Sequence, residues 1–146
     1  MARFRLTGET DGIHIPELSG SERRDDLWQT TCFEIFWQAE GEEAYREFNL
    51  SPSLEWAAYD FDSHRRNGRD APVKALAISC GHDHQSLMLV ADISADLPMP
   101  ARISLSAVIH AKDGSLQYWA LAFCDGHPDF HSHECRVLSL SVDRAQ

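Results

Sequence analysis

The sequence predicts an all-β protein, an antiparallel β-sandwich of about eight or more strands. Apolar residues alternate with polar ones at a period of two in one segment after another, and no segment of useful length has a helical period. Turn signals separate these segments at roughly the 8–12-residue spacing typical of sandwiches and barrels. With 146 residues, 43% of them hydrophobic, the chain can bury a core of its own. We therefore expect a single domain over residues 1–146.

The strands follow from local patterns in chain order. Residues 31–37 carry Phe33, Ile35 and Trp37 on one apolar face and a mixed set on the other, so Trp37 is expected in the core. The pair Asp113-Gly114 lies between two such segments and predicts the clearest hairpin, because it supports positive backbone angles. The other expected strands are residues 3–7, 45–50, 55–61, 73–80, 86–93, 102–111, 116–123 and 137–142, with a loop at 62–71.

Charge and composition limit the classes of partner. The chain has 23 acidic and 13 basic residues, a formal net charge of -10, which repels nucleic-acid backbones and anionic membrane surfaces. No early apolar segment resembles a signal peptide, and no apolar run approaches a membrane span. We therefore expect a cytoplasmic protein that binds neither nucleic acid nor membrane. Its four cysteines lack close pairing and are expected to be reduced thiols: Cys32, Cys80, Cys124 and Cys135.

Motifs of catalysis are absent from the sequence. It contains no nucleophile elbow, no phosphate-binding glycine loop and no HExxH, and none of the cysteines has a base implied nearby. The acidic pairs Asp25-Asp26 and Asp60/Asp62 fall in expected loops without an identified cleft. The expectation is a protein that is not an enzyme.

Three aromatic and polar segments carry a resemblance to a known family. They are Leu27–Glu34, Asn49–Phe61, which contains Asn-Leu-Ser-Pro-Ser and Trp-Ala-Ala-Tyr-Asp-Phe, and His127–His131. Together they resemble the bacterial DOMON-like domains, which are related to the family-nine carbohydrate-binding modules. The resemblance is specific over residues 27–61 and 127–142 and topological between them. It implies an immunoglobulin-like or jelly-roll sandwich that binds a sugar or a haem and has no catalytic activity of its own.

The chain departs from that family at its start. Relatives usually carry an additional strand ahead of the segment equivalent to residues 3–7. The resemblance therefore implies a truncated start or an open sheet edge. Because an unpaired edge is a template for pairing with another chain, we expect a homodimer or a covered edge.

A carbohydrate site is the first functional expectation. Sugar rings stack their C–H faces on aromatic rings, and their hydroxyls need carboxylate, amide or guanidinium partners. The sequence offers these types around the segments that carry the resemblance. The expected ligand-binding residues are Trp28, Glu34, Asn49, Trp56 and Arg65. Trp28 stands at the entry of its strand and is expected to be exposed, although tryptophans in strands are more often core residues.

Glu34 has two interpretations. A glutamate between Phe33 and Ile35 must be hydrogen-bonded or ion-paired if it is buried. It could pair internally with an arginine or with strand-end backbone groups. Alternatively, Glu34 and Asn49 share one face of adjacent strands and line a concave cavity. The substitution Glu34→Gln separates these, since loss of ligand binding in an unchanged fold favours the cavity.

Haem is an alternative ligand. Its iron needs a His and a Met, or two His, aimed into one apolar pocket. Met88 and His110 lie in predicted strands and Met99 lies between prolines, but nothing in the sequence brings two of them together. A structural role as a β-sandwich that dimerises through its open edge is a further alternative.

Two histidine-containing loops raise the alternative of a divalent metal. Imidazole pairs can hold Zn²⁺ or Ni²⁺, although loop histidines are usually solvated and neither loop has the spacing of a structural zinc site. Carboxylates such as Asp60 and Asp62 suit calcium without forming a diagnostic loop. No metal is therefore assigned. The histidines concerned are His82 and His84 in one loop and His127, His131 and His133 in the other.

Overall fold

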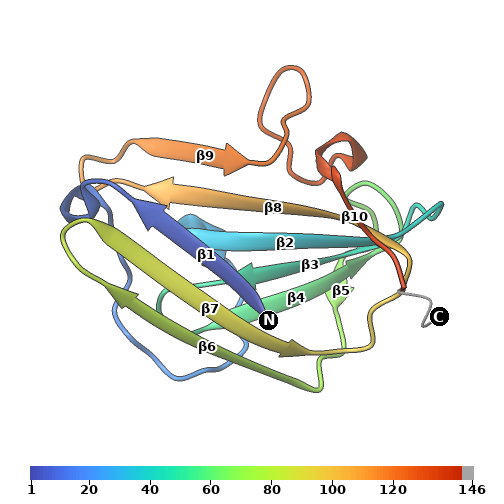
Figure 1. Ribbon diagram of the computed structural model, residues 1–146, viewed down its shortest axis with the longest axis horizontal. Coiled ribbons are helices and arrows are strands. Elements are labelled where there is room, and N and C mark those ends of the chain that lie inside the picture. Colours follow the sequence, from blue (N-terminus) through green and yellow to red (C-terminus); the bar gives the residue numbers. More distant parts are fainter. Residues whose placement is uncertain (143–146) are drawn as a thin grey trace.

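A computed structural model describes residues 1–142 and confirms an all-β fold of two packed antiparallel sheets (Figure 1). Within that range the smaller sheet has the order β1-β7-β6. The larger has the order β10-β8-β2-β3-β4-β5, and β9 also pairs with β8. The strands are β1 (Ala2–Thr7), β2 (Cys32–Ala39), β3 (Tyr45–Leu50), β4 (Trp56–Phe61), β5 (Arg69–Asp70), β6 (Ala75–His82), β7 (Ser86–Ser94), β8 (Ala101–His110), β9 (Leu116–Ala120) and β10 (Leu138–Leu140). Three 3-10 helices accompany them: η1 (Thr10–Gly12), η2 (Leu27–Gln29) and η3 (His133–Cys135).

Local turn chemistry produces the hairpins. β8 and β9 pair antiparallel as expected, and at their turn Gly114 has a φ of 89° while Asp113 accepts hydrogen bonds from the backbone and hydroxyl of Ser115. The hairpins β2–β3, β3–β4 and β6–β7 are also formed. Several bounds differ from expectation by one or two residues, and two differences are larger. β9 ends at Ala120, and the loop expected at 62–71 contains the short strand β5, which pairs with β4.

The core lies between the two sheets. Alternate residues of β2 and β3 point into it, among them Phe33, Phe48 and Leu50, each at most 3% exposed. They meet the apolar face of β7 and β6 from the smaller sheet. Full burial of such side chains stabilises the fold by about 1.5–3 kcal/mol each. Trp37 packs against this core as expected and donates its indole N–H to the carbonyl of Pro98 at 2.9 Å.

The outer face of the larger sheet is partly covered by its own chain. Residues 121–137, hereafter the cover segment, run over this face between β9 and β10 (Figure 1). Phe130 packs with Phe36 and Tyr45 of the sheet. The guanidinium of Arg136 lies 4.4 Å from the centre of the Tyr45 ring and donates two hydrogen bonds, at 3.0 and 3.1 Å, to the carbonyl of His131. This buried arginine attaches the cover segment to the sheet.

The edge of β1 that is unpaired among the described residues is the edge through which the expected homodimer would form. β1 pairs with β7 on one side, and no strand of the described chain pairs with its other edge. A homodimer through that edge stays a prediction, as does the missing first strand. The four cysteines are free thiols, as expected. Within residues 1–142, no helix has the length and apolar character needed to cross a membrane.

Candidate functional site

A cavity of about 770 Å³ opens on the outer face of the larger sheet. Strands β2, β3 and β4 supply its floor. Its walls come from the segment before β2, the segment between β4 and β5, strands β5 and β9, and the cover segment. The lining residues are Asp25, Asp26, Trp28, Glu34, Glu47, Asn49, Tyr59, Phe61, Arg65, Gly68, Arg69, Asp70, Val108, Tyr118, Pro128, Phe130 and His131.

Strand register brings the polar floor together. Glu34 on β2 stands directly opposite Asn49 on β3, and Glu47 follows two residues away on the same face. Because their neighbours in sequence point into the core, these three side chains share the outer face. All three are buried, with exposed fractions of 5%, 2% and 7% for Glu34, Asn49 and Glu47. The period of two thus sorts apolar and polar residues to opposite faces.

Glu34 and Glu47 interact as two carboxyl groups that share a hydrogen bond. Burial raises the pKa of Glu34 well above its ordinary value, and the charge of Glu47 and their hydrogen bond raise it further. Burial also raises the pKa of Glu47, against the lowering effect of hydrogen bonds from Glu34 and Asn49. Since two adjacent carboxylates repel each other in a desolvated site, the pair retains a proton to higher pH than isolated glutamates do.

Asn49 adds to the floor an amide oxygen that accepts no hydrogen bond from the described residues. Its amide hydrogen-bonds to Glu47, and its Oδ1 has no hydrogen-bond partner among the described residues. A buried amide oxygen left unpaired costs about 1–3 kcal/mol, so native structures rarely retain one. An unpaired acceptor beside two carboxyl groups indicates a floor that awaits hydrogen-bond donors.

His131 borders the floor in its neutral form. Burial, with the charge of Arg65 as the next cause, lowers the pKa of His131 to about 4. The Tyr45 hydroxyl accepts a hydrogen bond from the backbone of Arg65 and lies 2.7 Å from Nδ1 of His131. Tyr45 therefore donates to Nδ1, which leaves the imidazole proton on Nε2, 3.6 Å from Glu47. Because the imidazole is neutral, this approach is not an ion pair.

Aromatic side chains form the walls. Trp28 is 55% exposed, as expected for a residue at a strand entry, and its carbonyl accepts a hydrogen bond from His110 Nε2 at 3.1 Å. Tyr118 of β9 is 43% exposed on another wall. Tyr59 donates its hydroxyl to Asp25 at 2.6 Å, and burial together with this bond raises the pKa of Tyr59. The walls thus present open ring surface above a polar floor.

The two arginines of the walls are held by acids from outside the cavity. Arg65 donates to Asp129 at 2.9 Å, and Arg69 donates to Asp62 at the same distance. Neither aspartate lines the cavity. Each arginine therefore has an acidic partner at the outer end of its side chain, while the charge of Arg65 still acts on Glu34, Glu47 and His131.

Four of the five expected site residues line this cavity. Trp28, Glu34, Asn49 and Arg65 do so. Trp56 does not, because it stands opposite Leu50 in the β3–β4 register and faces the core side of the sheet, where the guanidinium of Arg23 lies 4.6 Å from its ring centre. The expected inclusion of Trp56 is therefore corrected.

Other cavity residues lie outside the set of five expected ligand-binding residues. Glu47 lies two residues before Asn49 on β3, so strand periodicity alone predicts that both side chains point to the same face. Tyr59 follows by the same periodicity along β4. Tyr118, Phe130 and His131 come from distant parts of the chain, and no local pattern predicts that they cover this face.

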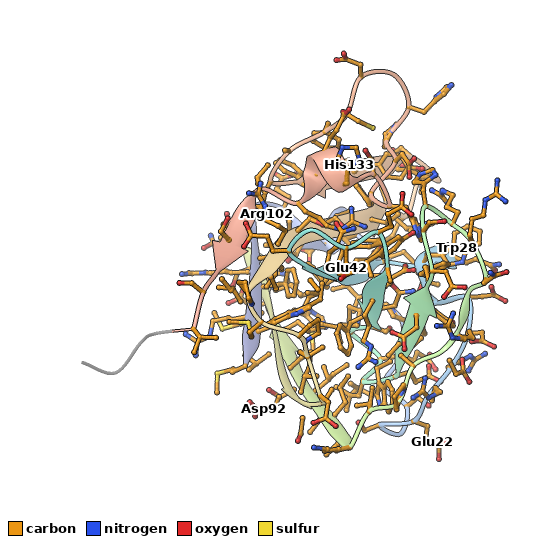
Figure 2. All side chains as sticks on the ribbon, turned by 90° about the vertical axis from the view of Figure 1, so that its right-hand side faces the viewer. Glu22, Trp28, Glu42, Asp92, Arg102 and His133 are labelled. Carbon is orange, nitrogen blue, oxygen red and sulfur yellow. The ribbon has the colours of Figure 1, made fainter. Side chains whose placement is uncertain are left out.

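Met88 and His110, the strand residues named for the haem alternative, lie on opposite sides of the sandwich. Met88 is exposed on the outer side of β7 in the smaller sheet, where it stands opposite Arg5. His110 lies on the outer side of the larger sheet beside Trp28. Their side chains point away from the sandwich on opposite sides, so the two cannot ligate one iron. Figure 2 shows these two outer sides, with Trp28 on the right and Asp92 of β7 at the lower left.

The two histidine loops lie at opposite ends of the sandwich (Figure 1). His84 contacts Asp11 at 2.8 Å at the β6–β7 turn. His131 is engaged with Tyr45, and His64 contacts Asp129 at 2.7 Å. Over residues 1–142, no group of three or more His, Cys, Asp and Glu side chains is placed to hold a metal ion.

Comparison with known proteins places the fold and leaves the family open. No family model and no curated protein matches the sequence. Among solved structures, the chain is similar to a protein from Bacteroides uniformis described as a proposed carbohydrate-binding protein, with a TM-score of 0.57 and 11% sequence identity. The similarity covers 94% of this chain and 69% of the other. At this identity the likeness shows a shared fold, and membership of the DOMON-like family stays a prediction.

Proposed function

We propose that the protein is a non-catalytic ligand-binding module for carbohydrate and that the cavity on the larger sheet is its binding site. One observation carries this proposal. Exposed aromatic surface from Trp28 and Tyr118 stands above a buried polar floor whose acceptors are incompletely paired. A sugar needs this combination, because its C–H faces stack on rings while its hydroxyls form several directional hydrogen bonds.

The polar groups fit the roles that a sugar requires. A carboxylate accepts from two neighbouring hydroxyls at once, and Glu34 and Glu47 both present carboxyl oxygens to the cavity. Asn49, opposite Glu34 on the neighbouring strand, offers an unpaired amide oxygen. Arg65 supplies a donor whose position is set by Asp129. The fold shared with the Bacteroides uniformis protein supports the same ligand class.

The test is a binding titration followed by tryptophan fluorescence and calorimetry. The panel contains neutral methyl glycosides of the gluco, galacto and manno series and the matching disaccharides. Trp28→Ala should weaken binding on the order of tenfold, because truncation of an aromatic anchor typically costs more than about 1 kcal/mol. Trp119→Ala is the matched control. Trp119 is equally exposed, at 57% against 55%, and lies outside the cavity.

The outcomes separate the proposal from its alternatives. Binding that survives Trp28→Ala and is lost in Trp119→Ala would move the site to another surface. Absence of binding across the panel and its amino and N-acetyl forms would overturn a carbohydrate module. Hydrolysis or other turnover of a bound glycoside, followed by chromatography, would contradict the non-catalytic assignment.

A further inference from the structure

We infer that the cavity selects a carbohydrate that carries a protonated amine, such as an amino sugar, over the corresponding neutral sugar. This inference rests on the proposed function and names the ligand class of the same site. Three features of the cavity lead to it: the chemistry of the floor atoms, the balance of charge around them, and the aromatic walls.

The floor consists of acceptors. Glu34 and Glu47 present carboxyl groups side by side, and the Oδ1 of Asn49 lacks a partner among the described residues. The Asn49 amide donates a hydrogen bond to Glu47, which leaves its Oδ1 as the unpaired acceptor. A neutral sugar hydroxyl brings one donor to each contact, whereas an ammonium brings three. An ammonium can therefore satisfy both carboxylates and Asn49 together.

The balance of charge also favours a cation. Five carboxyl side chains line the cavity, namely Asp25, Asp26, Glu34, Glu47 and Asp70, against the guanidinium groups of Arg65 and Arg69. Both guanidiniums are paired with aspartates outside the lining, at 2.9 Å each. His131 is neutral at physiological pH, since its pKa is about 4. Of the five acids, Asp70 approaches an arginine, with Arg23 Nη1 at 3.9 Å. The cavity thus keeps an excess of negative charge.

The walls add a second attraction for a cation. Aromatic rings attract positive charge to their faces, and the attraction grows as the cation is desolvated. Tyr59 and Tyr118 join Trp28 in the lining. The same rings accept the C–H face of a sugar. Ring and ammonium recognition are therefore compatible in one ligand.

Binding of an ammonium displaces a proton from the floor, whereas binding of a neutral sugar does not. Burial and the repulsion between Glu34 and Glu47 favour retention of a proton by this pair in the free site. When an ammonium hydrogen-bonds to both carboxylates, that proton leaves to solvent, and the cation takes its place. No covalent bond forms or breaks in the ligand. The charge of the floor with its occupant is the same before and after, so the exchange avoids burying a second negative charge.

The test compares matched ligands by calorimetry at pH 6.5. Each of the gluco, galacto and manno series is measured as the methyl glycoside, the 2-amino form and the 2-N-acetyl form. Titrations in phosphate and in HEPES, which differ in ionisation enthalpy, count the protons released. We expect the 2-amino form of the preferred series to bind on the order of tenfold tighter than the neutral forms, as charge-assisted hydrogen bonds do. It should release up to about one proton, and the neutral glycosides should release none.

Substitutions in the floor test whether its carboxyl groups cause the preference for an amine. Glu34→Gln should bring the affinity for the amino form close to that for the neutral glycoside and abolish proton release, with circular dichroism unchanged. Asp92→Asn, which removes an exposed acid from the smaller sheet on the opposite side, should leave both unchanged. Glu47→Gln repeats the measurement if Glu34→Gln fails to fold.

The outcomes distinguish the two proposals. Neutral glycosides that bind as tightly as the amino forms, with binding lost in Trp28→Ala, would overturn the amine preference and retain the carbohydrate module. Equal binding of cyclohexylamine, which has the ammonium without hydroxyls, would overturn the carbohydrate part of the inference. Absence of binding by every sugar would overturn both.

Discussion

The two faces of the larger sheet are built by the same strands and bury different chemistry. On β2 and β3, the inner face carries Phe33, Phe48 and Leu50, while the outer face carries Glu34 and Asn49. All five are at most 5% exposed. The inner groups meet the smaller sheet and are satisfied by packing alone. The outer groups lie under loops and walls, and their hydrogen bonding is incomplete.

This contrast supports the proposal that the outer face of the larger sheet is the ligand-binding face. Burial of an apolar group stabilises the fold, whereas burial of a carboxyl or amide without full pairing costs stability. A chain under selection for stability alone would place apolar groups on both faces of strands that are buried on both sides. The polar row on the outer face therefore supports the proposal that a ligand completes its hydrogen bonding.

The largest expected effect is on the inner face. Phe48→Ala should lower the free energy of unfolding by about 3–5 kcal/mol, because it removes a large buried ring and leaves a cavity between the sheets. Urea denaturation followed by fluorescence measures this loss. Leu116→Ala is the control, since Leu116 is 45% exposed and its truncation should change little. A loss below about 1 kcal/mol for Phe48→Ala would contradict the assignment of this face as the core.

The fold could be predicted from the sequence because its determinants are local. Alternation in residues 31–37 and the Asp113-Gly114 turn specify strands and a hairpin from neighbouring residues alone. The site could be predicted in part. Periodicity separates Glu34 from Phe33 and Ile35 within one strand. Whether Asn49 or Trp56 shares the face of Glu34 depends on the strand register. The side chains of the cover segment depend on a long-range arrangement that no local pattern encodes.

A second expected effect is a loss of folding stability in acid that comes from His131 of the cover segment. The pKa of His131 is lowered to about 4 in the folded state, against an ordinary value of 6.5, so the unfolded chain binds more protons between these values. The stability that His131 contributes is present above pH 6.5 and is lost as pH falls toward 4. The loss amounts to about 3 kcal/mol for a largely buried group. Denaturation of wild type and His131→Gln between pH 4 and 7 measures it as the difference between the two curves.

The exposed His84 provides a control of opposite sign. Its hydrogen bond to Asp11 raises the pKa of His84, so its contribution is present below pH 6.5 and is lost as pH rises through the raised value. His84→Gln should therefore make the loss of stability in acid no smaller than in wild type. If His131→Gln and wild type lose stability in parallel, His131 is not held neutral beneath the cover segment.

The smallest expected effect is the pH dependence of stability that comes from Glu47 in the cavity floor. Burial raises the pKa of Glu47 in the folded state, so the folded chain binds more protons than the unfolded chain above pH 4.5. The stability linked to this proton is full below pH 4.5 and is lost as pH rises through the raised value. Glu47→Gln keeps the shape and removes the titration. The stability of the variant should therefore rise relative to wild type as pH rises, by about 1 kcal/mol at pH 8, the lower end of gains measured when buried charges are replaced.

Glu42→Gln, at the exposed β2–β3 turn, is the control and should follow the wild-type curve. A Glu47→Gln variant that is less stable than wild type at pH 8 would mean that the ionised carboxylate is needed by the fold, and the outer face would then be structural like the inner one.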